Sequence, residues 1–457
     1  MKSWLLLASL AFSSILSAQT VYTSDWESLD KRPVPQWWCD AKFGIFIHWG
    51  IYAVPAYAPT DVANVYAKYS EHYDNRLRHN NPAFSNFHAR TYGPHIQYAD
   101  FATHFRAEHF DPAQWAELFK ESGARYVVLT SKHHDGYALW PSDYSPRWNS
   151  QFLGAHRDLA GELSTAVKAA GLHMGFYYSL LEWGNALYAK ETIDRWAMEM
   201  NLPQMKELVM RYHPEIIWTD GEWDFTDTEL HSMDFLAWLF NDSPVKDRVV
   251  VNDRWGKKIR SKHGGHYTTE YSHGQNQANE AQPIVHPWEE CRGIGGSFGY
   301  NRFERLDQYM SSAACVETLI DTVSRGGNLL LNIGPRPDGL IPVIMEQRLR
   351  DMGQWLKVNG EAIYGTTAWQ YRPNDMRENK CFFTKKPDAL YVICTRWPQK
   401  PILVSSVNRA TSVTLLGSET PIEFTCANNT LTLHPPLLNP ATVPCDFAWT
   451  FKVNQAK

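Results

Sequence analysis

A helix–strand unit that recurs along most of the chain is the feature that most restricts its fold. In residues 111–136 an amphipathic stretch ends at Gly123 and is followed by the apolar run YVVLTS. Asp111 and Pro112 at the start of this stretch are typical of a helix N-terminus. Repeated helix–strand units predict a parallel sheet, because each helix returns the chain to the same edge of the sheet.

The same pattern returns in DLAGELSTAVKAAGLHMGFYYS, in MKELVMRYHPEIIWTDG and in the segment that ends with GGNLLLNIGP. The runs KFGIFIHWG and DRVVVNDRW add further strands. About eight units over roughly 330 residues favour a closed (β/α)₈-type barrel over an open parallel sheet. In either architecture the active residues belong at the carboxyl ends of the strands.

Beyond residue 365 the pattern changes to short runs of β-forming residues separated by turn signals. CFFTKK, ALYVICTRW, PILVSSV, TSVTLLG, IEFTCA, TLTLHPP and FAWTFKV follow one another without an intervening helix. This spacing predicts an antiparallel β-sandwich of about 90 residues. We therefore expect a barrel domain over residues 19–365 and a sandwich domain over residues 366–457.

The first 18 residues, MKSWLLLASLAFSSILSA, have the charge, apolar run and small-residue end of a secretory signal peptide. The apolar run is too short to span a membrane, and no later stretch approaches that length. The sequence thus predicts export, to a periplasmic, extracellular or lysosomal destination. The seven cysteines are odd in number and scattered, which describes neither a disulfide scaffold nor a zinc site. Most are expected to be small buried hydrophobic residues.

The charge of the chain argues against one class of partner. A net charge of −5 leaves no basic footprint, so nucleic acid is not an expected partner. The 19 Trp residues fit stacking against sugar rings as well as they fit a large aromatic core.

Polar and charged residues follow the predicted strands at the point where each strand ends. Asp220 comes directly after EIIW, and a capping role in the next turn is its structural alternative. Any one such residue is more often structural than catalytic, but together they predict a polar, aromatic cup at one end of the barrel. The others are His48, His133, His134, Tyr177, Tyr178, Arg254, Glu289 and Glu290.

The cup carries no signature of a metal or cofactor. His133 and His134 are adjacent, so on a strand they would point to opposite faces. The chain has no metal-ligand spacing and no Gly-rich phosphate loop. Carboxylates with neutral hydrogen-bonding groups are instead typical of a glycoside hydrolase, in which one carboxylate is the nucleophile and another the general acid/base.

Several of these segments resemble the retaining α-L-fucosidases of glycoside hydrolase family 29. They are KFGIFIHWGIYAVPAYAP, ARYVVLTSKHHDGYALWPS, MGFYYSLLEW, IIWTDGEWD, VVNDRW and PWEECRGIGGSFGYNR. The resemblance covers nearly all of the barrel region in the expected order. It implies an exo-acting enzyme that removes terminal α-L-fucosyl residues from oligosaccharides or glycoconjugates through a covalent fucosyl-enzyme intermediate.

The resemblance also implies roles for individual residues. Asp220 matches the nucleophile and Glu289 the acid/base, with a carboxylate gap of about 5–5.5 Å expected for a retaining enzyme. Glu290 stays open as an alternative, since only one of the two adjacent residues can face the sugar. Phe46 and Trp218 would form an apolar wall against the C6 methyl group of fucose. The residues matched to substrate binding are Phe46, His48, Glu71, His133, His134, Tyr178 (preferred over Tyr177), Trp218 and Arg254.

One departure from the family pattern leaves the linkage preference open. The family commonly has Glu-Trp-Tyr where this chain has Glu71 followed by His72. Two hypotheses follow: the loss of the indole changes stacking on the sugar or its aglycone, and His72 titrates near neutral pH.

Three other functions compete with a fucosidase. An exo-glycosidase acting on an α-L-galactoside or a sulfated fucoside would share the catalytic features. A catalytically inactive glycan-binding protein is disfavoured, because a binder has no need to keep both Asp220 and Glu289. A structural or adhesion protein is the third alternative. The sandwich is expected to brace the barrel in preference to binding longer glycans.

Overall fold

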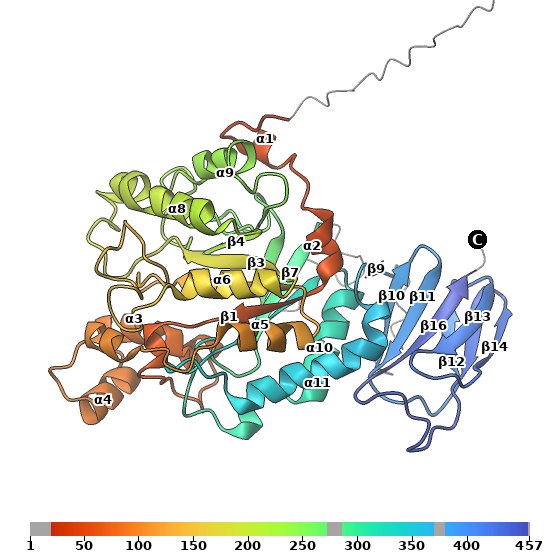
Figure 1. Ribbon diagram of the computed structural model, residues 1–457. Coiled ribbons are helices and arrows are strands. Elements are labelled where there is room, and N and C mark those ends of the chain that lie inside the picture. Colours follow the sequence, from red (N-terminus) through yellow and green to blue (C-terminus); the bar gives the residue numbers. More distant parts are fainter. Residues whose placement is uncertain (1–19, 272–285, 370–379, 456–457) are drawn as a thin grey trace, which may run out of the picture.

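A computed structural model describes residues 20–271, 286–369 and 380–455, so the predicted signal peptide lies outside the described residues. The chain forms a barrel surrounded by helices, with a β-sandwich beside it (Figure 1). Both halves of the predicted architecture are thus confirmed. The boundary predicted near residue 366 falls between a 3₁₀ turn, η7 (Gly360–Ala362), and the first sandwich strand.

The barrel is an eight-stranded sheet in which every paired neighbour is parallel. The strand order is β5-β4-β3-β2-β1-β8-β7-β6, and a parallel bridge between Asn252 and His266 closes the ring between β5 and β6. The strands are β1 (Phe43–Ile47), β2 (Tyr126–Lys132), β3 (His173–Ser179), β4 (Ile216–Asp220), β5 (Val250–Val251), β6 (Tyr267–Glu270), β7 (Trp288–Gly293) and β8 (Asn328–Ile333).

Helices cover the outside of the barrel and begin where local sequence favours them. Asp111 is the N-cap predicted for α5, and its side chain accepts hydrogen bonds from the backbone N–H groups of Ala113 and Gln114. The longer helices are α4 (Pro82–Thr91), α5 (Pro112–Glu121), α6 (Leu159–Ala169), α8 (Leu202–Tyr212), α9 (Ser232–Asn241), α10 (Ser312–Ser324) and α11 (Val343–Asn359). The shorter ones are α1 (Trp26–Leu29), α2 (Gln36–Ala41), α3 (Tyr73–Arg78) and α7 (Ile193–Arg195).

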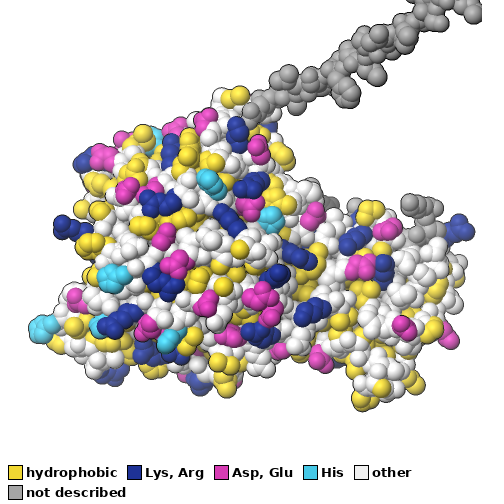
Figure 2. Space-filling model, viewed as in Figure 1, with side chains coloured by type: hydrophobic (Ala, Val, Ile, Leu, Met, Phe, Trp, Pro, Cys, Tyr) yellow, Lys and Arg dark blue, Asp and Glu magenta, His cyan; other side chains and the backbone are white. Residues whose placement is uncertain are grey.

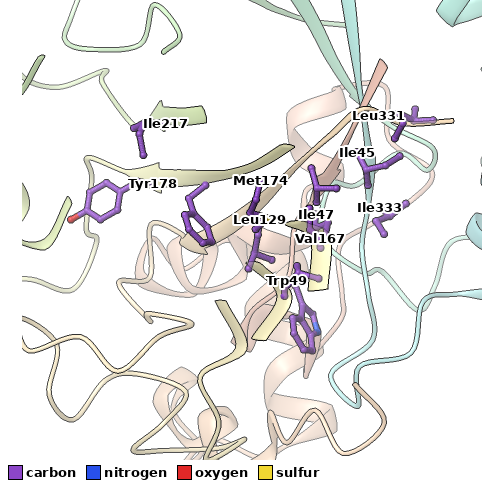
Figure 3. Close-up of a cluster of buried hydrophobic side chains, with 14 of the residues drawn as sticks. Ile45, Ile47, Trp49, Leu129, Val167, Met174, Tyr178, Ile217, Leu331 and Ile333 are labelled. Carbon is purple, nitrogen blue, oxygen red and sulfur yellow. The ribbon is translucent and has the colours of Figure 1, made fainter. Parts of the chain in front are cut away.

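Side chains on the strands alternate between the two faces of the sheet, as the extended backbone requires. Outward-facing residues such as Ile45, Leu129 and Met174 pack with Val167 of α6 in the main hydrophobic core (Figure 3). Inward-facing residues fill the barrel with a second cluster that includes Ile216 and Trp218 of β4. The same alternation turns Asp220, two residues after Trp218, towards the inside at the end of β4.

The C-terminal region is a sandwich of two antiparallel sheets with its own buried core. One sheet has five strands in the order β13-β16-β11-β10-β9, and the other has three in the order β12-β15-β14. Their bounds are β9 (Thr367–Ala368), β10 (Cys381–Lys386), β11 (Ala389–Cys394), β12 (Ile402–Ser405), β13 (Ala410–Leu415), β14 (Glu423–Ala427), β15 (Thr430–His434) and β16 (Trp449–Gln455).

The five-stranded sheet packs against the barrel beside α10 and α11 (Figure 1). Trp355 of α11 donates its indole N–H to the Ala448 carbonyl at 2.8 Å, and the Thr384 hydroxyl donates to the Ala362 carbonyl at 2.6 Å. Tyr391 and Ile393 belong to the same hydrophobic cluster as the barrel core. An apolar interface shared by the sandwich and the barrel is what the sandwich would need to brace the barrel.

The face of the molecule in Figure 2 mixes basic and acidic side chains without a broad patch of either sign. That nucleic acid is not a partner stays a prediction. Across the part of the chain that the structure describes, no helix combines the length and apolar character needed to cross a membrane.

Candidate active site

A pocket lies at the carboxyl-terminal end of the barrel strands, where β4 ends at Asp220 and β6 ends at Glu270. It brings together most of the residues predicted from the sequence: Phe46, His48, Glu71, His133, His134, Trp218, Asp220 and Arg254. Tyr177, which the sequence placed in the cup but not among the preferred binding residues, also lines the pocket. The rest of the lining is Tyr66, Tyr69, His72, Trp223, Glu270, Cys291 and Phe298.

Asp220 is held by hydrogen bonds from one cation and one hydroxyl group, with an imidazole close by. Its Oδ1 accepts from Arg254 Nη1 at 2.6 Å, and its Oδ2 accepts from the Tyr177 hydroxyl at 2.9 Å. The Nε2 atom of His134 lies 3.6 Å from Oδ2. Burial alone would raise the pKa of Asp220, but Arg254, His134 and Arg260 outweigh it and bring the pKa well below its ordinary value. The side chain is therefore a carboxylate at neutral pH.

Arg254 joins two carboxylates of the pocket through one guanidinium group. Its Nη2 donates to Glu270 Oε1 at 2.5 Å while Nη1 holds Asp220, and its Nε donates to Thr268 at 2.9 Å. The guanidinium carbon also lies 4.4 Å from the centre of the Trp218 ring, which supplies a cation–π contact. Arg254 thus fixes the direction of both carboxylates, and the sequence did not predict its partners.

Glu289 lies at the opposite end of the barrel from Asp220, which corrects the prediction that it follows a strand. PWEECRG begins strand β7 and does not end it, so Glu289 pairs with Asn328, the first residue of β8. Its Oε1 accepts from the Tyr126 hydroxyl at 2.6 Å and its Oε2 from the Trp218 indole N–H at 2.9 Å. It is 1% exposed and is not one of the described residues that line the pocket.

The alternation of side chains along β7 determines which of Glu289 and Glu290 faces the inside of the barrel. Glu289 faces the barrel interior, whereas Glu290 hydrogen-bonds to Thr269 on the outer side of β6. Neither carboxylate lies among the described pocket residues.

Tyr177, not Tyr178, faces the pocket, so the sequence-based preference was wrong. The Tyr177 hydroxyl donates to Asp220, while the Tyr178 hydroxyl donates to Gln204 Oε1 at 2.8 Å on the helix side. Lys132 Nζ donates to that same Tyr178 hydroxyl at 3.0 Å, and Figure 3 shows Tyr178 among the outward-facing core residues. Which of the two adjacent tyrosines points inward depends on the residue at which β3 begins, because side chains alternate along the strand. The sequence does not show where β3 begins.

Four histidines line the pocket, and the three predicted from the sequence, His48, His133 and His134, are neutral rings. His48 Nδ1 lies 2.7 Å from Asn332 Oδ1, and His134 Nδ1 lies 2.6 Å from the Ser179 hydroxyl. Burial lowers the pKa of His48 to about 3 and that of His134 to about 4, and it also holds the pKa of His133 well below its ordinary value. His133 and His134 do not point to opposite faces as predicted, because they follow the end of β2 and are not part of it.

Glu71 and His72 lie side by side in the pocket wall. Glu71 accepts from the Gly299 N–H at 2.8 Å and the Ser297 hydroxyl at 3.1 Å, and burial raises its pKa to about 7. The ring of His72 contacts the rings of His134 and Trp183 at centroid distances of 5.9 and 5.4 Å. Burial lowers the pKa of His72 to about 3, which contradicts the hypothesis that it titrates near neutral pH.

Glu270 is the acidic pocket residue that the sequence analysis missed. It ends the short strand β6, whose sequence YTTE repeats the pattern of a β-forming run followed by a carboxylate. That pattern is the one that identified Asp220, so the signal was present but the four-residue strand was not recognised. Within residues 20–271, 286–369 and 380–455, no three His, Cys, Asp or Glu side chains are grouped as metal ligands.

The pocket combines three acidic side chains, Glu71, Asp220 and Glu270, with an aromatic, partly apolar wall. Phe46 lies 5.0 Å from Trp218 and 4.6 Å from His48, measured between ring centres. An ionised carboxylate beside neutral imidazoles and a second acid can displace a leaving group from carbon and manage the proton transfers that this requires.

Comparisons with known proteins agree with this chemistry. The family profile described as "Alpha-L-fucosidase" matches residues 9–361, and the one described as "Alpha-L-fucosidase C-terminal domain" matches residues 373–454. An alpha-L-fucosidase of Branchiostoma floridae is 44% identical over 97% of this chain and 98% of its own length. The tissue alpha-L-fucosidase of Homo sapiens is 41% identical, over 95% and 92% respectively. The crystal structure of Thermotoga maritima alpha-fucosidase with a mechanism-based inhibitor superposes with a TM-score of 0.79 at 36% identity, covering 95% of this chain and all of that one.

Proposed function

Because the chain belongs to the α-L-fucosidase family, we propose that its pocket removes terminal α-L-fucosyl residues with Asp220 as the nucleophile. The enzyme is a retaining glycoside hydrolase. The observation that carries the assignment is the state of Asp220, which is an ionised carboxylate fixed by Arg254 at the end of a barrel strand. Carboxyl ends of barrel strands are where catalytic residues of this architecture gather.

The reaction proceeds in two displacements at the anomeric carbon of fucose. An Asp220 oxygen forms a bond to that carbon while the bond to the glycosidic oxygen breaks, and an acid donates a proton to the departing oxygen. The same group, now a base, takes a proton from water, whose oxygen attacks the anomeric carbon and releases Asp220. Two inversions give net retention.

We assign the acid/base role to Glu270 in place of Glu289. Glu270 lines the pocket and shares Arg254 with Asp220, whereas Glu289 is buried behind Trp218. A proton donor must lie within hydrogen-bond reach of the leaving oxygen, and the position of Glu289 does not allow this. The gap of about 5–5.5 Å expected between the two catalytic carboxylates then applies to Asp220 and Glu270.

The remaining pocket residues suit a 6-deoxy sugar. His48, His133, His134 and Glu71 offer hydrogen bonds to hydroxyl groups. Phe46, Trp218 and Phe298 offer an apolar surface to the C6 methyl group, where an α-L-galactoside would place a hydroxyl without a partner. Tyr177 replaces Tyr178 as the tyrosine of the site. The substrate is a terminal fucosyl residue of a glycan, reached after export directed by the N-terminal 18 residues.

The test is hydrolysis of an aryl α-L-fucoside in the presence of azide. In Asp220→Gly, azide takes the place of the nucleophile once, so the product is the fucosyl azide of inverted configuration. In Glu270→Ala, azide takes the place of water in the second displacement, so the product is the azide of retained configuration. Retained azide from Glu289→Ala and none from Glu270→Ala would return the acid/base role to Glu289. Full activity in Asp220→Gly would overturn the nucleophile assignment.

A further inference from the structure

Two cysteines of the sandwich face each other across a pair of antiparallel strands. Cys381 begins β10 and Cys394 ends β11, and the register of the two strands places them directly opposite one another. Their Sγ atoms are 3.1 Å apart. Cross-strand neighbours that bring two sulfurs this close need little movement of the backbone to be joined by a covalent bond.

The hydrogen-bond pattern shows that this pair occupies the favourable kind of site. Thr395 N–H donates to the Lys380 carbonyl at 2.9 Å, so the adjacent pair of residues is a hydrogen-bonded one. Hydrogen-bonded and non-hydrogen-bonded pairs alternate along an antiparallel ladder, which makes Cys381 and Cys394 a non-hydrogen-bonded pair. Side chains are closest at such pairs, as a disulfide requires.

We propose that Cys381 and Cys394 form a cross-strand disulfide in the exported protein. The proposal rests on the export proposed above, because disulfides persist in oxidising compartments and are rare in reducing ones. The oxidant is an external disulfide, such as oxidised glutathione. One cysteine thiolate attacks its disulfide to give a mixed disulfide and one released thiol. The second cysteine thiolate then attacks the protein sulfur of that mixed disulfide and releases the second thiol, which leaves two sulfurs oxidised and one external disulfide reduced.

The bond has to form while the sandwich is folding, because the native fold shields both sulfurs. Cys381 is 5% exposed and Cys394 is fully buried in the sandwich core. The same burial protects the finished disulfide from external thiols, since exchange needs access to a sulfur.

The bridge would stabilise the strand pair that carries the sandwich against the barrel. Lys380, beside Cys381, forms an ion pair with Glu317 of α10, and Thr384 of β10 holds the Ala362 carbonyl. Joining residues 381 and 394 closes a short loop and restricts the unfolded chain. Neither cysteine lines the active-site pocket, so the bridge changes stability and leaves turnover as it is.

The experiment counts thiols in two preparations. One is the protein exported under its own N-terminal segment. The other is the reduced protein refolded with reduced and oxidised glutathione. Each preparation is unfolded and alkylated, either without reduction or after reduction. Its peptides are then mapped by mass spectrometry. The expected result in both is a linked pair of peptides containing residues 381 and 394, with the five other cysteines of the seven alkylated without reduction.

The two preparations separate the two ways in which the proposal can fail. A bridge that forms on refolding but is missing from the exported protein overturns the disulfide in the exported protein. Failure of the N-terminal segment to export the chain overturns the export on which the proposal rests. Alkylation of all seven cysteines in both preparations overturns the disulfide itself. A fall in Tm of about 5 °C on full reduction is expected in the wild type and is absent in Cys394→Ala. Cys426→Ser, at an exposed position, is the matched control that keeps the shift.

Discussion

The two ends of the barrel each hold a buried carboxylate, and the two are held in different ways. At the mouth, Asp220 is paired with the Arg254 cation and opens onto a pocket. At the base, Glu289 is held by two neutral donors, the Tyr126 hydroxyl and the Trp218 indole, and is closed off from solvent. Trp218 connects the two ends, because its ring lies against Arg254 while its N–H reaches Glu289.

This difference shows how position along a strand determines the role of a carboxylate. An acid at the start of a barrel strand is enclosed by the next layers of side chains, so its hydrogen bonds serve to hold neighbours in place. An acid at the end of a strand meets open space, where a cation can keep it ionised and aimed at a ligand. We therefore propose that Glu289 positions the Trp218 wall and that Asp220 acts on the substrate.

Asp220→Gly should show the largest loss. Without the attacking oxygen the first displacement has no protein nucleophile, so kcat/KM for an aryl α-L-fucoside should fall by about 10⁴-fold or more. Steady-state kinetics measure this change, and Asp224→Gly, a nearby acidic residue outside the pocket lining, is the matched control. A loss below tenfold would place the nucleophile elsewhere.

Glu270→Gln should show a loss that depends on the leaving group. General acid catalysis contributes about 10²–10⁴-fold, and a poor leaving group needs it more than an activated phenol does. The variant should therefore lose far more activity on a fucosylated oligosaccharide than on a nitrophenyl fucoside. Equal losses on the two substrates would argue that Glu270 only positions Arg254.

Glu289→Ala should affect stability first. The change leaves the Tyr126 hydroxyl and the Trp218 indole without their buried acceptor and opens a small cavity, at a cost of roughly 2–4 kcal/mol in the free energy of unfolding. Urea denaturation measures the loss, and Glu289→Gln, which keeps an acceptor oxygen, should recover part of it. If kcat/KM fell by the same factor as in Glu270→Gln, the proposal that Glu289 has a structural role and Glu270 a catalytic one would be wrong.

Tyr177→Phe and Tyr178→Phe form a matched pair at adjacent positions. Tyr177 donates to Asp220, the proposed nucleophile, so its loss should reduce kcat/KM by about 10- to 100-fold, as expected for a hydrogen bond to a charged group. Tyr178 donates to Gln204 away from the pocket, so its loss should lower Tm and leave kcat/KM nearly unchanged. The reverse pattern would show that β3 presents the other tyrosine.

The neutral histidines of the mouth should make stability depend on pH. His48 has a pKa of about 3 in the folded protein, whereas an unfolded histidine takes up a proton near pH 6.5. The unfolded state therefore binds more protons below pH 6.5, and the free energy of unfolding should fall as the pH is lowered. Glu71 has a raised pKa of about 7 in the folded protein, so its contribution to the free energy of unfolding changes with pH in the opposite direction.

His48→Gln isolates the contribution of one histidine. Its free energy of unfolding should vary less steeply than that of the wild type between about pH 6 and 4, by up to about 1.4 kcal/mol per pH unit. Urea denaturation at several pH values checks this, with the surface variant His79→Gln as control. Equal slopes in wild type and His48→Gln would mean that the ring is protonated in the folded state.

Local patterns in the sequence were enough to predict the architecture and the position of Asp220 at the mouth of the barrel. The helix–strand repeat predicted the parallel barrel, the short β runs predicted the sandwich, and the carboxylate after EIIW predicted Asp220 at the mouth. These features succeed because they depend on residues close together in the chain. The resemblance of the motifs to α-L-fucosidases added the substrate class, which periodicity alone does not provide.

The tertiary structure decided which of two adjacent residues faces the pocket and which carboxylates share it. Side chains alternate along a strand with a period of two, so an error of one residue in the start of β3 exchanges Tyr177 for Tyr178. An error of a few residues in the start of β7 likewise moves Glu289 from the mouth to the base. The partnership of Asp220 with Glu270 through Arg254 joins three different strand ends, and such contacts exist only once the barrel has closed.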